Sequence, residues 1–499
     1  MATYNRPGVY VEDVINTTQP IAGATSDSIA AFAGVIDRGP TTATLVTSWS
    51  QYTSLFGSWG TNNLVTTAVS LFFANGGNRC YIQRVVASDS VIASRTIKDT
   101  TSGTAVDTIK LSAISAGAWG NNIRVAVTAS VLGTSYFNLN VYYGGATDNY
   151  IVERFVDITM NTADARYAIP VINASSKYVV ATDMLASDSF DATDNPAVTS
   201  ASALTSGADG TAVTTANIVT GLAGLDVVNN ALILNVPGVT SATDVNNIIT
   251  YATNRNDTFV VVDGVNDTVA NQLTLAATYT VSTNAAVYYP VLTIPSPVSS
   301  APGATWTAFN GGAVVGKMVS NDAARGVFKA PAGIETRLSG VLSVATLTNA
   351  NLDSLNSATA PVNAIRYVPG AGIVIMGART LDQSYAGRYV PVRRSIIYLH
   401  KALADLTQFA IFEPNDVRLW NRLTATVQAF LTDFWQKGGL SGQSPTDAFF
   451  VKCDGENNTS ATVAQGQVLL EVGVALRRPA EFVIIRISQY DSGAVVTIS

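Results

Sequence analysis

The chain has 499 residues, of which 47% are hydrophobic and only 13% charged, and its formal net charge is -6. This length gives room for roughly three domains and a large buried core. The scattered Lys and Arg argue against nucleic-acid binding, which needs clustered positive charge, and the apolar stretches fall short of the ~20 residues that span a bilayer.

The first residues predict an extended segment. Val9 and Val11 alternate with Tyr10 and Glu12, which is typical of a β-strand. A single terminal strand must pair with a sheet edge, either in its own chain or in another, and the sequence leaves both alternatives open. No secretory signal pattern precedes this segment, so we expect folding in a cytoplasm.

An α/β unit is predicted next. An apolar run at residues 29–36 indicates a strand, residues 64–74 show helical spacing, and residues 80–86 indicate a second strand. The pattern then changes between residues 95 and 205, where Gly, Asn and Ser turns separate short alternating runs. This pattern predicts an all-β insertion with strands at 108–111, 123–128, 137–143 and 178–180.

The stretch from residue 195 to 217 is rich in Ala, Thr, Ser and Gly, and we interpret it as a linker or surface loop. After it, the runs at 231–236, 259–263 and 285–293 are apolar on both faces. Strands of this kind must be covered on both sides, so they predict a largely parallel sheet with intervening helices.

The last 110 residues predict two long helices. One has an apolar stripe from Ile396 to Ala410, and the other spans residues 417–434 after the start signal Pro414-Asn415-Asp416. Strands are expected at 448–453 and 467–476. The run at 482–487 predicts another strand close to the C-terminus.

The sequence offers little for catalysis or metal binding. His400 is the only histidine, so a multi-histidine metal site within one chain is excluded, and any Ser-His-Asp triad would have to use it. Asp188, Asp191 and Asp194 lack the EF-hand pattern and are interpreted as a solvated loop. Cys80 and Cys453 are too isolated to indicate a zinc site. We therefore predict a protein that is not an enzyme and needs no cofactor.

Several motifs, in order along almost the whole chain, resemble the tail sheath protein of contractile phage tails and related contractile injection systems. None is specific alone, but their order and spacing are. They are Arg6-Pro7-Gly8-Val9-Tyr10-Val11-Glu12-Asp13, Gly117-Ala118-Trp119-Gly120-Asn121, Asp322-Ala323-Ala324-Arg325-Gly326-Val327, Ala330-Pro331-Ala332-Gly333, Asn363-Ala364-Ile365-Arg366, Gly377-Ala378-Arg379-Thr380-Leu381, and the block from Tyr389-Val390-Pro391-Val392-Arg393-Arg394 to Arg477-Arg478-Pro479-Ala480-Glu481.

The resemblance implies stacked hexameric rings that form a helical sheath around a tail tube and contract to drive the tube through the host cell envelope. It implies tail tube, baseplate and tail terminator proteins as partners, in a virion assembled in the host bacterial cytoplasm. It also implies that the terminal arms add strands to sheets of neighbouring subunits. The arm residues expected to do so are Val9, Tyr10, Val11, Glu12, Phe482, Ile484, Ile485 and Ile487.

The fold expected from the motifs and the resemblance is multidomain, α/β and α+β, with a subtilisin-like middle region. That region contains no histidine, so the similarity is one of fold only. The expected division is an N-terminal arm at 1–20, the first part of the α/β core at 21–94, a β-rich outer insertion at 95–205, the α/β sheath domain at 206–378, a C-terminal inner domain at 379–480, and a C-terminal strand and arm at 481–499.

By the same resemblance the C-terminal domain faces the tube, so basic residues near its two helices are candidates to attract an acidic tube surface. Solvated helix faces and ion pairs within the chain remain an alternative for each of them. The candidates are Arg393, Arg394, Lys401, Arg418, Arg422 and Lys437. The main alternative for the whole chain is another lattice-forming virion or surface protein, and a hydrolase is the third.

Overall fold

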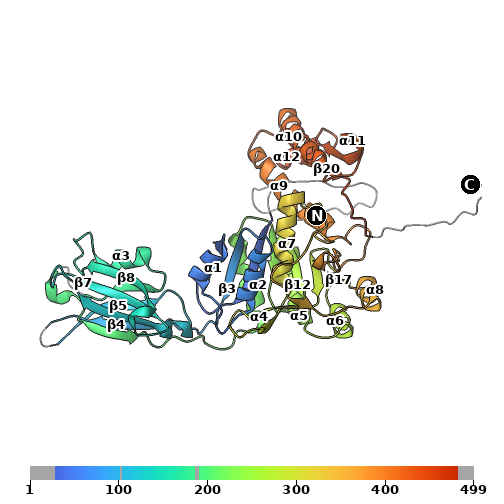
Figure 1. Ribbon diagram of the computed structural model, residues 1–499. Helices are drawn as coiled ribbons and strands as arrows, with labels where there is room; N and C mark the ends of the chain where they lie inside the picture. The colour runs from blue at the N-terminus through green and yellow to red at the C-terminus, as the bar shows by residue number, and fades with distance from the viewer. Residues whose placement is uncertain (1–27, 102–103, 186–189, 482–499) are drawn as a thin grey trace, which may run out of the picture.

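The computed structural model describes residues 28–101, 104–185 and 190–481. They form an α/β body, a β-rich body at one end of the molecule, and a C-terminal body on another side of the α/β body (Figure 1). Both predicted terminal strands, with Val9 to Glu12 in one and Phe482 to Ile487 in the other, lie outside the described residues.

An eight-stranded sheet forms the centre of the α/β body. From β17 to β3 all neighbouring strands are parallel, and only the two outermost pairs are antiparallel. This confirms the expected, largely parallel sheet. In spatial order the strands are β18 (Gly372–Ile375), β17 (Val362–Val368), β13 (Ala285–Tyr289), β12 (Thr258–Asp263), β11 (Leu232–Asn235), β1 (Ile29–Val35), β3 (Cys80–Val85) and β2 (Thr44–Val46).

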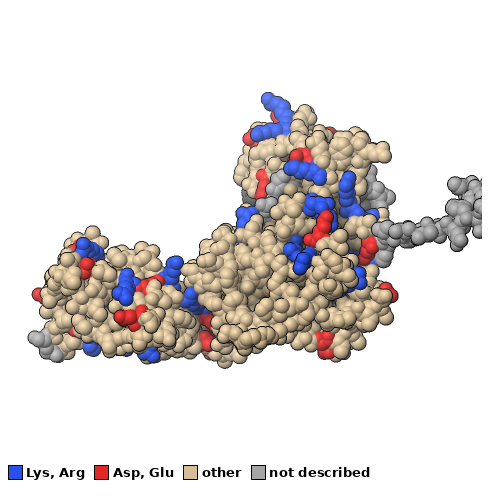
Figure 2. Space-filling model, viewed as in Figure 1, with Lys and Arg blue, Asp and Glu red and all other residues tan. Residues whose placement is uncertain are grey.

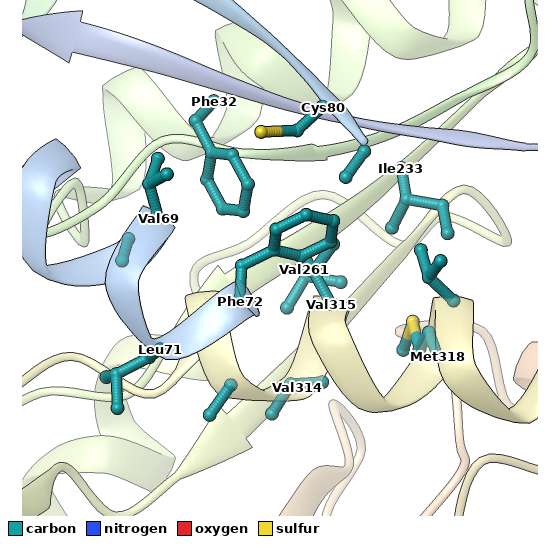
Figure 3. Packing of buried hydrophobic residues seen from close by; sticks show 14 of the residues in the cluster. Phe32, Val69, Leu71, Phe72, Cys80, Ile233, Val261, Val314, Val315 and Met318 are labelled. Carbon is teal, nitrogen blue, oxygen red and sulfur yellow. The ribbon is translucent and has the colours of Figure 1, made fainter. Parts of the chain in front are cut away.

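Helices cover both faces of this sheet, as strands with fully buried side chains require. One apolar cluster joins the sheet to α1 (Trp49–Phe56), α2 (Leu64–Ala74) and α7 (Gly311–Arg325). Phe32 of β1, Phe72 of α2 and Met318 of α7 meet in it (Figure 3). A second cluster holds the other face, under α4 (Thr215–Gly221), α5 (Ala242–Arg255), α6 (Val269–Ala276) and α8 (Asn349–Ser357).

Glycines allow α2 and α7 to pack closely. A Cβ atom on Gly312 would lie 2.1 Å from the carbonyl oxygen of Ala68, and one on Gly316 would lie 2.6 Å from that of Phe72. Neither position has room for a side chain, because the obstacle is backbone.

The predicted strand at residues 285–293 is two strands in the structure. Pro290 has no N–H to donate, and the chain leaves the large sheet there. Beyond it, β14 (Leu292–Pro295) pairs with β15 (Thr305–Ala308) and β16 (Ser343–Val344) in a small separate sheet.

The insertion at 95–205 folds around its own apolar core, between two sheets. Its helix α3 (Ala168–Ser175) corrects the all-β expectation, because Ala168 and Ile172, one turn apart, are buried in that core. The strand β10 lies within the stretch expected to be a linker. The sheets are β4 (Ser94–Lys98), β5 (Asp107–Ala113) and β9 (Val179–Asp183), and β10 (Thr199–Ala203), β6 (Ile123–Ala129), β7 (Phe137–Tyr143) and β8 (Ile151–Ile158).

The C-terminal body contains both predicted long helices, α9 (Val390–Thr407) and α10 (Val417–Gln436). Asp416 begins α10 as expected, because its carboxylate accepts hydrogen bonds from the backbone N–H groups of Arg418 and Leu419. An antiparallel pair, β19 (Phe449–Lys452) and β20 (Glu471–Val474), completes the body with α11 (Pro445–Ala448) and α12 (Ser460–Ala464). In the described part of the chain, no helix is long and apolar enough to cross a membrane.

Candidate functional site

The first turns of α9 dock the C-terminal body onto the α/β body. Arg394 is only 1% exposed, and its Nη1 lies 3.0 Å from Oδ1 of Asp322 near the end of α7, while its Nη2 binds the other carboxylate oxygen. A bidentate pair of this kind fixes direction as well as distance. Because the buried guanidinium needs a compensating charge, the pair holds α9 against α7.

The neighbouring Arg393 is also buried, at 8% exposure. Its Nε donates to Oδ1 of Asn284, which precedes β13, over 2.5 Å. For Arg393 and Arg394 these contacts favour the alternative of partners within the chain, and a role toward a tube stays a prediction. Both side chains point from α9 into the α/β body.

The side chains of the other four basic candidates are at least partly exposed to solvent. Nζ of Lys401 is bound by Asn229 (2.9 Å) and Asp405 (3.0 Å), and its side chain is 12% exposed. By contrast, the Arg418 side chain is 94% exposed. The Arg422 guanidinium lies 4.1 Å from the centroid of the Phe409 ring, and Lys437 lies beside Asp433 at 2.6 Å. Their role toward a tube stays a prediction.

Sequence reasoning missed an ion pair at the start of the C-terminal segment. Arg379 donates from Nε and Nη2 to the two carboxylate oxygens of Glu481, over 2.8 and 2.6 Å, and from Nη1 to the Asn356 carbonyl oxygen. The hydroxyl of Tyr389 donates to the same carboxylate. Glu481 is the last described residue, and the pair fixes its position against Arg379. The only signal was that Arg379 and Glu481 both lie in motifs of the resemblance.

The carboxyl edge of the parallel sheet, where α/β folds commonly bind ligands, holds one buried carboxylate. Asp263, at the end of β12, is 1% exposed and accepts hydrogen bonds from the N–H groups of Gly238 (2.9 Å) and Gly311 (2.6 Å). Burial raises its pKa to about 6. Asp263 thus acts as an internal cap for the start of α7 and is closed to a substrate.

The other residues considered for catalysis or metal binding lie where they serve the fold. His400 is 8% exposed within α9. Asp191 and Asp194 cap a short 3₁₀ helix, whereas Asp188 lies outside the described residues. Cys80 and Cys453 are buried, and burial raises the pKa of Cys453 to about 11, as expected of inert thiols. Within the described ranges, no group of His, Cys, Asp and Glu is placed to hold a metal ion.

Comparisons with known proteins point to a sheath. Residues 382–489 match the family model of the phage tail sheath C-terminal domain. A tail sheath protein of Vibrio phage KVP40 is 26% identical over 123 residues, which cover 24% of this chain and 17% of that relative. The chain therefore matches only a small part of the relative's length.

Solved sheath structures show the same fold over nearly the whole chain. The sheath complex of an extracellular contractile injection system in its contracted state is 21% identical, with a TM-score of 0.58 and coverage of 98% of this chain and 99% of that one. The contracted helical sheath of the anti-feeding prophage is 21% identical, with a TM-score of 0.59 and coverage of 98% of this chain and 100% of that one. A sheath tail protein from Listeria innocua is 12% identical, with a TM-score of 0.61 and coverage of 92% of this chain and 97% of that one.

These matches confirm the resemblance to contractile tail sheath proteins that the motifs indicated. The matched proteins are structural sheath components and not enzymes, in agreement with the sequence.

Proposed function

We propose that the chain is a structural subunit of a contractile sheath. It polymerises as stacked hexameric rings around a tail tube and contracts to drive the tube through the envelope of a target cell. The observation that carries this proposal is the shared fold with contracted sheaths over 98% of the chain. The family match of residues 382–489 supports it independently.

The two-stranded sheet of the C-terminal body supports assembly by strand donation. An isolated strand pair is marginally stable and leaves hydrogen-bonding groups unpaired at its edges. Among the described residues, β19 and β20 pair only with each other, and a single bridge joins Leu440 to Leu476 beyond them. Terminal strands of neighbouring subunits would complete this sheet by β-augmentation.

The anchor at Glu481 fits the same scheme. Arg379 forms a bidentate ion pair with the Glu481 carboxylate. A C-terminal strand donated to a neighbour would therefore leave the subunit from a fixed point. Strain on a donated strand would then be transmitted to the α/β body through Arg379.

The finer parts of the proposal follow the domain division given above. The insertion at 95–205 projects outward, the middle region at 206–378 is subtilisin-like in fold, and the C-terminal domain at 379–480 faces the tube. Tube, baseplate and tail terminator proteins are the partners, and the assembled sheath belongs to a virion formed in the host bacterial cytoplasm.

Negative-stain microscopy of the purified chain, alone and with its tube protein, tests the proposal. Hollow striated cylinders are expected in the presence of the tube protein, whereas another lattice former would give sheets or shells, and monomers that persist with the tube protein present would overturn the proposal. Deletion of residues 1–15 should leave the subunit folded by circular dichroism but unable to polymerise. Normal cylinders from the truncated chain would refute strand donation by the N-terminal arm.

Charge reversal tests the tube-facing candidates. Arg418→Glu with Arg422→Glu should weaken sheath–tube co-assembly, and more so at low salt, because exposed charges are screened by salt. Lys98→Glu, an exposed lysine of the insertion at 62% exposure, is the matched control and should leave co-assembly unchanged. Equal co-assembly by all variants would remove these residues from the interface.

A further inference from the structure

Two hollows open where the α/β body meets the C-terminal body, and Arg325 and Phe328 line both. We call them the α7 groove and the exit groove. The α7 groove, of 460 Å³, lies at the end of α7, and the exit groove, of 470 Å³, lies beside residues 477–481.

Positive charge is concentrated in these walls. The α7 groove is lined by Arg79, Arg325 and Lys437, and the exit groove by Arg325, Lys329, Arg477 and Arg478. Each also has an acidic residue, Asp322 and Glu481 respectively, and both are bound by arginines of the chain itself. Arg325 and Lys437 have acidic partners as well, Glu335 at 3.0 Å and Asp433 at 2.6 Å, but these pairs are at least half exposed. Exposed ion pairs contribute little, so the carboxylates of a bound peptide can compete for both cations.

This concentration of positive charge in the groove walls is unusual for the chain, which as a whole has more acidic than basic residues. Figure 2 shows Lys and Arg, with some Asp and Glu among them, on the C-terminal body and at its junction with the α/β body, while much of the visible face of the α/β body carries no charge. Positive potential at this junction therefore favours an anionic occupant.

Aromatic side chains give the α7 groove an apolar wall. The rings of Phe328 and Phe434 meet edge to face with centroids 5.8 Å apart, and the ring of Tyr398 lies 5.7 Å from that of Phe434. An apolar wall beside cations suits a peptide in which apolar and acidic side chains stand close together.

The chain contains such a peptide. Residues 9–14 read Val-Tyr-Val-Glu-Asp-Val, and they belong to the 27 residues that precede the described structure. Ser28, the first described residue, lines the α7 groove. The residues between Val14 and Ser28 can span up to about 46 Å when extended, so the peptide can return to the groove.

We propose that the α7 groove of the unassembled subunit holds residues 9–14 of the same chain, with Glu12 and Asp13 beside Arg325 and Lys437. Tethering favours this occupant over a second copy, because a short linker gives an effective concentration on the order of millimolar. The bound peptide cannot pair with another subunit, so premature polymerisation is suppressed. This last step rests on the proposed function, whereas occupancy of the groove does not.

A disulfide cross-link tests the contact in the purified full-length monomer. Asp13→Cys is combined with Lys437→Cys, and the matched control combines Asp13→Cys with Lys98→Cys in the insertion. The native Cys80 and Cys453, at 0% and 7% exposure, are poorly placed to compete. Mild oxidation should give at least about tenfold more intrachain disulfide in the first pair than in the control. Cross-links only between chains, or no excess over the control, would overturn the proposal.

Charge exchange provides a second measurement. Glu12→Lys with Asp13→Lys should speed hydrogen exchange of the peptide about tenfold, and adding Arg325→Glu with Lys437→Glu should restore protection. Unchanged exchange in the first variant would also overturn the proposal. An intrachain cross-link in a chain that never forms cylinders would contradict only the proposed function. Cylinders from a chain without that cross-link would contradict only this inference.

Discussion

The α/β body is joined to the insertion and to the C-terminal body by arginines, but with different chemistry at the two joints. At the insertion, the buried guanidinium of Arg38 lies 5.7, 5.8 and 4.9 Å from the ring centroids of Trp119, Tyr143 and Tyr178. Nearby, Arg84 donates to backbone carbonyl oxygens on both sides of the joint, including that of Ala116 at 2.7 Å. The hydrogen bonds of Arg38 and Arg84 go to backbone carbonyl oxygens and not to carboxylates.

At the C-terminal body the partners are carboxylates, Asp322 for Arg394 and Glu481 for Arg379. A bidentate pair allows one orientation, whereas a cation over aromatic faces retains its attraction through small rotations. The C-terminal joint should therefore resist rotation more than the insertion joint does. A subunit whose C-terminal domain carries assembly contacts would need this arrangement.

The largest effect is expected from Arg394→Ala. It leaves the Asp322 carboxylate, which is 20% exposed, without this partner. The expected cost is about 3 kcal/mol in the free energy of unfolding, the lower end of the range for a buried pair. Urea denaturation measures the loss. Arg418→Ala, at a 94% exposed side chain, serves as the control and should leave the midpoint unchanged. A similar midpoint shift for both variants would mean that the C-terminal joint is not held by this pair.

A smaller loss, about 2 kcal/mol, is expected from Arg38→Ala, because contacts with three rings and two carbonyl oxygens are removed. Small-angle scattering should show greater spread in the position of the insertion, while its own core stays folded. Arg166→Ala, which removes an exposed contact with Tyr136 in the same insertion, is the control. An unchanged scattering profile for Arg38→Ala would contradict the assigned role.

Glu481→Gln should cost about 1 kcal/mol, because a charge-assisted pair with partly exposed partners becomes a neutral contact. The change should be local, so hydrogen exchange of residues 477–481 is the suitable measurement. Salt should reduce the difference between wild type and variant. An equal rise in exchange throughout the C-terminal body would contradict a local role for this pair.

The smallest effect concerns pH and involves a group inside the α/β body and away from both joints. Burial raises the pKa of Asp263 to about 6, above the value of about 3.9 in an unfolded chain. The folded state therefore binds this proton more tightly, and its contribution to stability falls as pH rises through 6. Relative to Asp263→Asn, the wild type should lose about 1 kcal/mol between pH 5 and pH 7, measured by denaturation at both pH values. A constant difference would contradict this prediction.

Local pattern predicted some elements well. The helix at Leu64–Ala74 and the strand at Phe137–Tyr143 have the expected bounds, because each has a clear period between strong turn signals. It missed β10, whose sequence Thr-Ser-Ala-Ser-Ala resembles a linker and becomes a strand only by pairing with β6. It also missed α3, a short apolar segment that helical packing against β9 decides.

The type of protein could be predicted from the sequence, since motif order, composition and an isolated histidine are properties of the chain. Only the tertiary structure decided what the arginines do. Arg394 meets a carboxylate 72 residues away and Arg379 one 102 residues away. No local period encodes such pairs, because burial of a charge is decided by which distant group arrives to compensate it.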